Sequence, residues 1–166
     1  MTAVPDDPTV VDATVLSNFA AVARVSAVAG LSGVCTTPVV RDEIERGVEN
    51  HPYLQSAVDA FEGEMPVVCI SEAVADRESS IRGHLDPGEA QALAVADVHD
   101  GRLLTDDGDA RTFARERSVT VVGSVGILLA AVDAGQITES TANRWLQTWI
   151  DEFGYYAPHR RLGDYR

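Results

Sequence analysis

Short apolar runs rich in valine and leucine alternate with longer stretches of helical periodicity along this chain of 166 residues. Strands separated by helices of about 10 to 15 residues are typical of a parallel sheet that is covered by helices on both faces. The sequence therefore predicts an α/β fold, a three-layer α/β/α sandwich around a mostly parallel central sheet. We expect strands at 10–11, 34–36, 102–105 and 119–122, the last of them buried, and a strand or extended connection at 67–70.

Helices are expected in the connections between these runs. Thr37 followed by Pro38 is a typical start signal, because threonine can cap a helix and proline suits its first turn. No repeat, low-complexity tract or linker divides the chain, so we expect one domain over 1–166, with a flexible N-terminus at 1–8 and a C-terminal tail at 154–166. The expected helices cover 14–29, 37–46, 52–61, 71–82, 86–96, 109–117, 125–134 and 140–153.

The charge balance is strongly negative. There are 26 acidic residues against 13 basic ones, every basic residue is arginine, and the net charge is −13. This balance is typical of a salt-rich cytoplasm, where salt screens self-repulsion, and we expect a halophilic archaeon as the source. Replacement of lysine by arginine in a GC-rich genome is the alternative. Such a chain repels nucleic acid at low salt, so any nucleic-acid role needs metal ions, a local arginine cluster or screening.

Nothing in the chain resembles a membrane segment or a secretion signal. No apolar stretch approaches the roughly 20 uncharged residues of a membrane span, and the start of the chain lacks the basic region of a signal peptide. We therefore expect a soluble, cytoplasmic protein with no membrane partner.

The two cysteines, Cys35 and Cys69, each stand alone in an apolar run. Neither has a cysteine or histidine at the spacing of a zinc site, so we expect buried structural thiols. The histidines are scattered in turn-like or terminal contexts, and we expect them at the surface.

Acidic residues follow the predicted strands or stand in the first turns of the helices after them. The carboxyl ends of parallel strands form one rim of a sheet, and ligands bind in the crevice there. Carboxylates brought to one rim would form an oxygen-only site suited to Mg²⁺ or Mn²⁺. Without a cation or a proton they would repel one another, by ~4 kcal/mol for a close pair at an effective dielectric constant of about 20. The acids concerned are Asp12, Glu43, Glu89, and the neighbouring pair Asp106 and Asp107.

Each of these acids also has a purely structural explanation. Asp12 could cap the helix that follows it, and Glu43 could be a solvated helix residue. Glu89 stands three residues after Asp86, which is close to a capping box. Asp107 and its acidic neighbour could stabilise a turn and cap the next helix. Their joint placement, rather than any single acid, favours the metal site.

Five segments in the same order resemble the PIN-domain ribonuclease family. The resemblance is strongest to the PIN-like branch that supplies the toxins of bacterial and archaeal toxin–antitoxin pairs. It extends from about residue 10 to 150, nearly the whole chain. The matching segments are VVDATVL at 10–16, PVVRDEI at 38–44, LDPGEAQALA at 85–94, LLTDDGDAR at 103–111, and VVGSVGILLA at 121–130 with GQI at 135–137.

The resemblance implies a divalent-metal-dependent endoribonuclease that uses Mg²⁺ or Mn²⁺. In this chemistry the ion lowers the pKa of a bound water and stabilises charge on the attacked phosphate. The implied substrate is RNA, and an antitoxin protein is the implied partner. The implied ligands and catalytic residues are Asp12, Glu43, Glu89 and Asp107, with Asp106 as the alternative to Asp107 or as its partner.

Other residues fit further positions of the family. Thr14 and Thr105 match places where the family often has a hydroxyl near the metal. Arg41, Arg111 and Arg115 are the candidates for phosphate contacts, although Arg111 could instead pair with Asp107 or Asp109. Asp97, later in the helix of Glu89, is a candidate extra acid.

Two functions other than a nuclease are compatible with parts of the same pattern. A catalytically silent PIN-like protein that acts as a binding or scaffold module is the alternative. A phosphatase with Asp12 as covalent nucleophile is disfavoured, because Thr14 stands where such enzymes need a second aspartate and the chain has no lysine.

Aromatic residues gather toward the C-terminus. Trp145 and Trp149 lie four residues apart and therefore share one helix face, for which core packing is the expected role. Contact with a second copy in a homodimer, which we expect, or with an antitoxin is the second interpretation, because interfaces favour such residues. Stacking of RNA bases is the third. The group comprises Trp145, Trp149, Phe153, Tyr155 and Tyr156.

Overall fold

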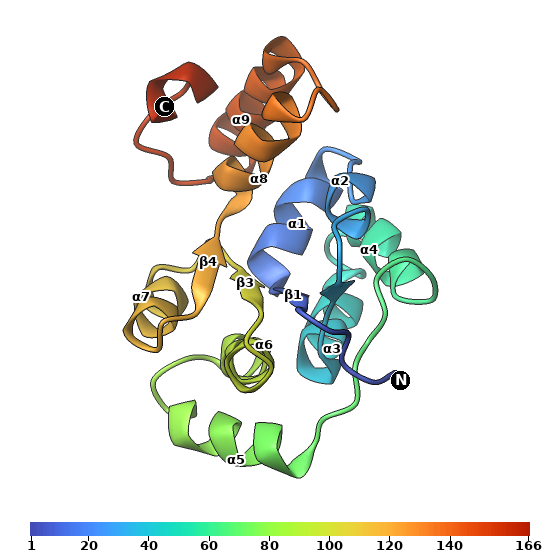
Figure 1. Ribbon diagram of the computed structural model, residues 1–166. Helices are drawn as coiled ribbons and strands as arrows, with labels where there is room; N and C mark the ends of the chain where they lie inside the picture. Colours follow the sequence, from blue (N-terminus) through green and yellow to red (C-terminus); the bar gives the residue numbers. More distant parts are fainter.

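A computed structural model describes all residues from 1 to 166 and contains a four-stranded sheet in the order β2-β1-β3-β4 (Figure 1). All neighbouring strands are parallel, and Val10 of the central strand β1 lies opposite Cys35 on one side and Leu103 on the other. The predicted parallel sheet is thus confirmed. The strands are β1 (Thr9–Val11), β2 (Val34–Cys35), β3 (Arg102–Leu104) and β4 (Thr120–Val122).

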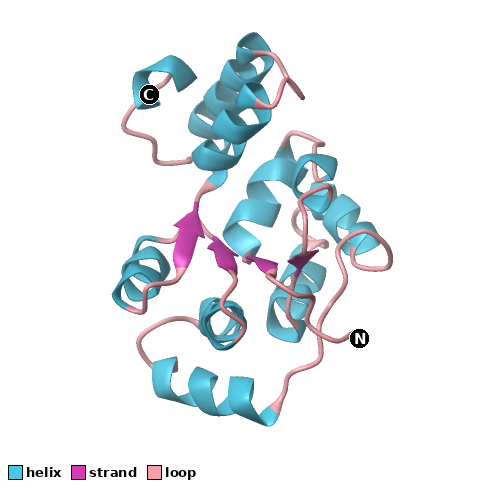
Figure 2. Ribbon diagram, viewed as in Figure 1, coloured by secondary structure: helices cyan, strands magenta, loops and turns pink.

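Helices cover both faces of this sheet, as Figure 2 shows. α1, α8 and α9 lie on one side, and α6, backed by α5, lies on the other (Figure 1). The predicted three-layer α/β/α sandwich is confirmed. The α-helices are α1 (Ala13–Ala21), α2 (Ser26–Ala29), α3 (Pro38–Gly47), α4 (Gln55–Ala60), α5 (Glu72–Ile81), α6 (Pro87–Val98), α7 (Gly108–Glu116), α8 (Ser124–Asp133) and α9 (Glu139–Phe153), and the 3₁₀ helices are η1 (Pro52–Leu54) and η2 (Leu162–Tyr165).

The single helix expected at 14–29 is wrong, because the chain turns after α1. Ala23 has a φ of +57°, the left-handed conformation that ends many helices. The Arg24 amide donates to the Phe19 carbonyl at 2.8 Å, and the Ala23 amide donates to the Ala20 carbonyl at 3.0 Å. This is a Schellman motif with alanine in the position that glycine usually takes, so the sequence carried no stop signal there.

Two expectations about burial also need correction. Cys35 is buried as expected, but Cys69 is exposed because its segment forms only isolated bridges, such as Thr36 to Val67, instead of a strand inside the sheet. The strand expected to be buried at 119–122 is the edge strand β4, which has a neighbour on one side only. Its side chains are therefore partly exposed and available to line a cavity.

The aromatic end of α9 belongs largely to the core. Trp149 is fully buried, and its ring meets that of Phe19 edge-on at a centroid distance of 5.1 Å. Its indole N–H donates to the Asn18 carbonyl at 2.6 Å, which fixes α9 to α1. Trp145 is also buried. Core packing, the expected role of the two tryptophans, is confirmed.

Candidate functional site

Asp12 follows β1 directly and is 2% exposed. Its Oδ1 accepts from the Ala13 amide at 2.7 Å, and its Oδ2 accepts from the Thr105 hydroxyl at 2.7 Å and from the Thr14 hydroxyl at 3.2 Å. Burial raises the pKa of Asp12 from 3.8 to about 6 in spite of these hydrogen bonds, and the charge of Asp86 adds to the rise. A carboxylate held this deep in a fold favours a proton or a cation beside it.

Thr105 and Thr14 join the ends of β1 and β3. Thr105 Oγ1 donates to Asp12 and accepts from the Asp107 amide at 3.2 Å. Thr14 Oγ1 accepts from the Asp106 amide at 3.0 Å. The two hydroxyls therefore fix the loop after β3 against the start of α1, next to Asp12.

Glu89 lies in the first turn of α6, where it forms a complete capping box with Asp86. The Glu89 amide donates to Asp86 Oδ1 at 2.8 Å, and the Asp86 amide donates to Glu89 Oε2 at 3.2 Å. Glu89 is 8% exposed, and its pKa is raised to about 8, first by burial, then by Asp86, and then by the charges of Asp107 and Asp12. The capping interpretation of Glu89 is confirmed, and the same carboxylate faces the other acids.

Glu43 reaches the same cluster from α3. Burial raises its pKa, and the charges of Asp86 and Asp12 raise it further. A β-carbon on Gly88 would stand 2.8 Å from Glu43 Oε1, so the carboxylate lies directly against the first turn of α6. Only glycine at position 88 leaves that space.

The structure thus brings together the four acids that the sequence selected. Asp86, for which the sequence indicates only a capping role, joins them, because its charge acts on both glutamates. α1, α6 and α7 all begin here, with Asp12, Asp86 and Asp107 as their N-caps, so that three helix N-termini with their positive dipole ends border the cluster. As the side chains stand, no three acidic, histidine or cysteine groups are close enough together to hold a metal ion.

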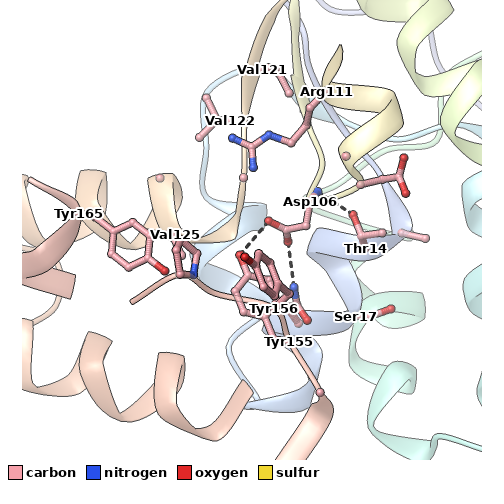
Figure 3. A pocket seen from close by; sticks show the side chains of 18 of the residues that line it. Thr14, Ser17, Asp106, Arg111, Val121, Val122, Val125, Tyr155, Tyr156 and Tyr165 are labelled. Carbon is pink, nitrogen blue, oxygen red and sulfur yellow. Dashed lines mark hydrogen bonds between the residues drawn. The ribbon is translucent and has the colours of Figure 1, made fainter. Parts of the chain in front are cut away.

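Asp106 faces a different direction from its neighbour Asp107. Its Oδ1 accepts from the Ser124 amide at 2.8 Å and the Tyr155 hydroxyl at 3.2 Å, and its Oδ2 accepts from Asn18 at 2.9 Å and from the Ser124 hydroxyl. In Figure 3 this carboxylate lies among the side chains of α1, α8 and the tail. Asp107 instead caps α7, and its charge acts on Glu89.

Arg41 and Arg111, two of the predicted phosphate contacts, differ in their surroundings. Arg41 pairs with the adjacent Asp42 at 3.1 Å on the surface of α3. Arg111 lines a cavity, forms no ion pair, and has a buried Nε atom without a hydrogen-bond partner. Its alternative pairing with Asp107 or Asp109 is therefore not found.

Asp97, the candidate extra acid, is engaged elsewhere. It forms ion pairs with Arg77 and, at 3.4 Å, with Arg117. These contacts hold the C-terminal end of α6, the end opposite to Glu89.

The cavity beside the acids measures about 1130 Å³. Glu43 and Asp107 line it, and so do Tyr155, Tyr156 and Tyr165 of the C-terminal segment. The sequence indicates the acids and offers Tyr155 and Tyr156 for base stacking, but it does not place the two sets around one cavity. The tail residues reach it only because the chain turns back after α9, a long-range event that no local pattern signals.

A family model for the PIN domain, DUF3368, matches residues 8–164, and the chain therefore belongs to the PIN-domain family. Among curated proteins none matches this chain. PIN domains are generally nucleases and typically use divalent metals, so the family indicates a nuclease-type hydrolase. No helix has the length and apolar character that a membrane crossing requires.

Proposed function

We propose that this protein is a divalent-metal-dependent endoribonuclease that hydrolyses RNA phosphodiester bonds. The observation that carries the proposal is the gathering of Asp12, Glu43, Glu89 and Asp107 at the carboxyl ends of β1 and β3, where burial first, and then the acidic neighbours, raise the pKa of each glutamate. In a parallel sheet this rim is where ligands bind.

The donor set fits Mg²⁺ or Mn²⁺. It consists of carboxylate oxygens supported by threonine hydroxyls, which are the hard ligands that these ions prefer. Asp12, Glu43, Glu89 and Asp107 would hold the ion, which when bound supplies an activated water and stabilises charge on the phosphate. A cation would also remove the mutual repulsion that adds to the effect of burial on the pKa values of Glu43 and Glu89.

Protein groups supply the remaining functions of the site. Thr105 and Thr14 orient the Asp12 carboxylate, and Arg111 is the cation on the cavity wall that can contact a phosphate oxygen. Because the net charge of the chain is −13, RNA binding would depend on the metal, on Arg111 and on salt screening.

The cellular role that we propose is that of a toxin held in check by an antitoxin protein, acting as a homodimer in the cytoplasm of a halophilic archaeon. The motif resemblance supports the toxin role, and the lysine-free acidic composition supports the halophilic source.

Metal binding tests the site. We expect Mn²⁺ titration by calorimetry to show at least about tenfold weaker affinity in the Asp12→Asn, Glu89→Gln double variant. The matched control is Glu62→Gln with Asp76→Asn, which removes the same charge from exposed positions outside the cluster. Equal affinity in the double variant and the wild type would overturn the metal assignment.

RNA cleavage tests the activity. Labelled single-stranded RNA incubated with Mg²⁺ in molar KCl should be cut by the wild type and by the control variant, but not by the double variant. A folded wild type that binds Mn²⁺ and leaves the RNA intact would favour the catalytically silent scaffold instead.

A further inference from the structure

The cavity continues from the acidic cluster to a wall built by the C-terminal segment. Tyr156 stands at this wall and is 87% exposed, the highest value among the large apolar side chains. Its ring contacts no other aromatic ring, and its hydroxyl makes no hydrogen bond within the chain. The fold therefore makes no evident use of this ring.

The neighbouring tyrosines are used differently. Tyr155 is half-buried and donates to Asp106, and its ring lies tilted against that of Trp149 at a centroid distance of 5.6 Å. Tyr165 bonds to the backbone of His159 and packs edge-on against its ring at 5.1 Å. These contacts fix the path of the tail, so Tyr156 projects from an anchored segment and not from a loose end.

Apolar residues of β4 and α8 line the same cavity as Tyr156. They are Val122, Val125 and Leu129. A β-carbon on Gly126 would stand 2.7 Å from Val122 Cγ1, so glycine at this position lets α8 lie close to the edge strand. The cavity therefore offers an open aromatic ring together with apolar side chains, which suit the face of a planar aromatic ligand.

Arg111 lines the same cavity. Figure 3 shows its guanidinium on the β4 side of Asp106, across from the tail tyrosines. No carboxylate pairs with it in a chain with twice as many acids as arginines. Its Nε is buried without a partner, so the phosphate oxygen of a ligand would accept from the terminal guanidinium N–H groups.

We propose that this arm of the cavity binds an unpaired nucleobase next to the scissile phosphate, stacked on Tyr156, with Arg111 contacting the backbone phosphate. The inference rests on the proposed function and assigns to that site a residue, Tyr156, that binds a base. Bases in a duplex have their faces covered by their neighbours, whereas splayed bases stack readily on aromatic side chains. Tyr156 is thus a binding residue that selects for strandedness.

The test measures binding separately from cleavage. A fluorescent single-stranded phosphorothioate RNA, which resists hydrolysis, is titrated with protein in Mg²⁺ and molar KCl, and anisotropy gives the Kd. Tyr156→Ala should raise the Kd by about 5- to 150-fold, the range expected for loss of one base–aromatic stack. Tyr156→Phe, which keeps the ring, should stay within about twofold of wild type.

Two controls make the result specific. Phe153→Ala removes another exposed aromatic ring, one that packs on Tyr53 outside the cavity, and should leave the Kd unchanged. The second control is a series of RNAs, each lacking one base at a different position. The RNA that lacks the base stacked on Tyr156 should bind wild type and Tyr156→Ala equally. A duplex of the same sequence should bind weakly and be indifferent to the variant.

The outcomes separate this inference from the proposed function. If the wild type cleaves RNA and the Tyr156→Ala variant binds RNA with an unchanged Kd, the base site is overturned while the nuclease proposal stands. Tyr156-dependent binding without cleavage of ordinary RNA supports the base site and removes the nuclease. A wild type that binds no RNA but loses a protein partner on Tyr156→Ala overturns the base site in favour of a protein contact.

Discussion

Tyr155 donates its hydroxyl hydrogen bond to Asp106 Oδ1 at 3.2 Å, which ties the C-terminal segment to the loop that carries Asp107. The same carboxylate accepts from Ser124 at the start of α8 and from Asn18 of α1. Asp106, the residue before the proposed metal ligand Asp107, therefore joins the C-terminal segment to α8 and α1. The adjacent acids Asp106 and Asp107 thus have different surroundings, and substituting each in turn should distinguish their roles.

Asp106→Asn and Asp107→Asn should have distinguishable effects. Loss of the Asp106 charge weakens hydrogen bonds that are strengthened by an ionised acceptor, so the free energy of unfolding should fall by about 1.5–3 kcal/mol while Mn²⁺ affinity changes little. Asp107→Asn should lower Mn²⁺ affinity by at least about tenfold. Denaturant melts and calorimetry check the pair, and the reverse pattern would make Asp106 the ligand.

Thr105→Val should weaken both the fold and the site. The buried Asp12 carboxylate and the Asp107 amide would each lose a partner, which we expect to cost about 1–3 kcal/mol of unfolding free energy. Because the Thr105 hydrogen bond lowers the pKa of Asp12, its removal should raise that pKa and weaken Mn²⁺ binding at neutral pH. Thr105→Ser keeps the hydroxyl and is the matched control; serine and valine variants with equal Mn²⁺ affinity would contradict the prediction.

Metal-free protein should lose stability as the pH rises. The folded-state pKa values of Asp12 and Glu89, about 6 and about 8, lie above their ordinary values of 3.8 and 4.5. Folding therefore favours their protonated forms, and their contribution to stability declines as the pH rises from about 4 through about 8. Melting temperatures in chelator should fall across this range.

The metal should reverse this trend. Mn²⁺ binds the ionised carboxylates, so it should raise the melting temperature most at the alkaline end and release protons on binding at lower pH. Glu89→Gln removes the carboxyl group with the higher of the two pKa values. It should therefore make the melting temperature of the metal-free protein depend less on pH. A variant profile as steep as that of the wild type would rule out Glu89 as the source of the trend.

Gly88→Ala should impair metal binding without harming the fold. The new β-carbon would stand 2.8 Å from Glu43 Oε1, the end of a flexible side chain that can move away. Alanine also suits a helix better than glycine, so the melting temperature should be unchanged or higher. Mn²⁺ affinity should nevertheless fall, which calorimetry checks. Gly63→Ala, where a β-carbon meets nothing within 4 Å, is the control and should bind Mn²⁺ normally.

The fold followed from sequence periodicity because each apolar run and each capping residue acts locally. Thr37 caps α3 and Asp86 caps α6 where the sequence predicts helix starts. The end of α1 could not be predicted, since Ala23 adopts a left-handed conformation that its residue type does not signal. The exposed position of Cys69 likewise depends on a segment that joins the sheet only through isolated bridges.

The placement of the acids could be predicted from the sequence because Asp12 directly follows β1 and Asp107 lies three residues after the end of the adjacent parallel strand β3. The sequence indicates only a capping role for Asp86, whereas in the structure its charge acts on both glutamates. The wall formed by Tyr156 depends on how the tail returns across α8. Such a contact between distant parts of the chain has no local sequence pattern.

The caps of α1, α6 and α7 have a consequence for the evolutionary history of such a chain. Asp12, Asp86 and Asp107 each accept a hydrogen bond from the helix that they start, so a descendant without activity would still need an acceptor there to stay folded. If relatives keep these three aspartates, that would reflect selection for a stable fold as much as selection for catalysis. Glu43 caps no helix, so it can be substituted once hydrolysis is no longer selected. Its replacement in a relative is therefore the clearer sign that the relative has lost activity.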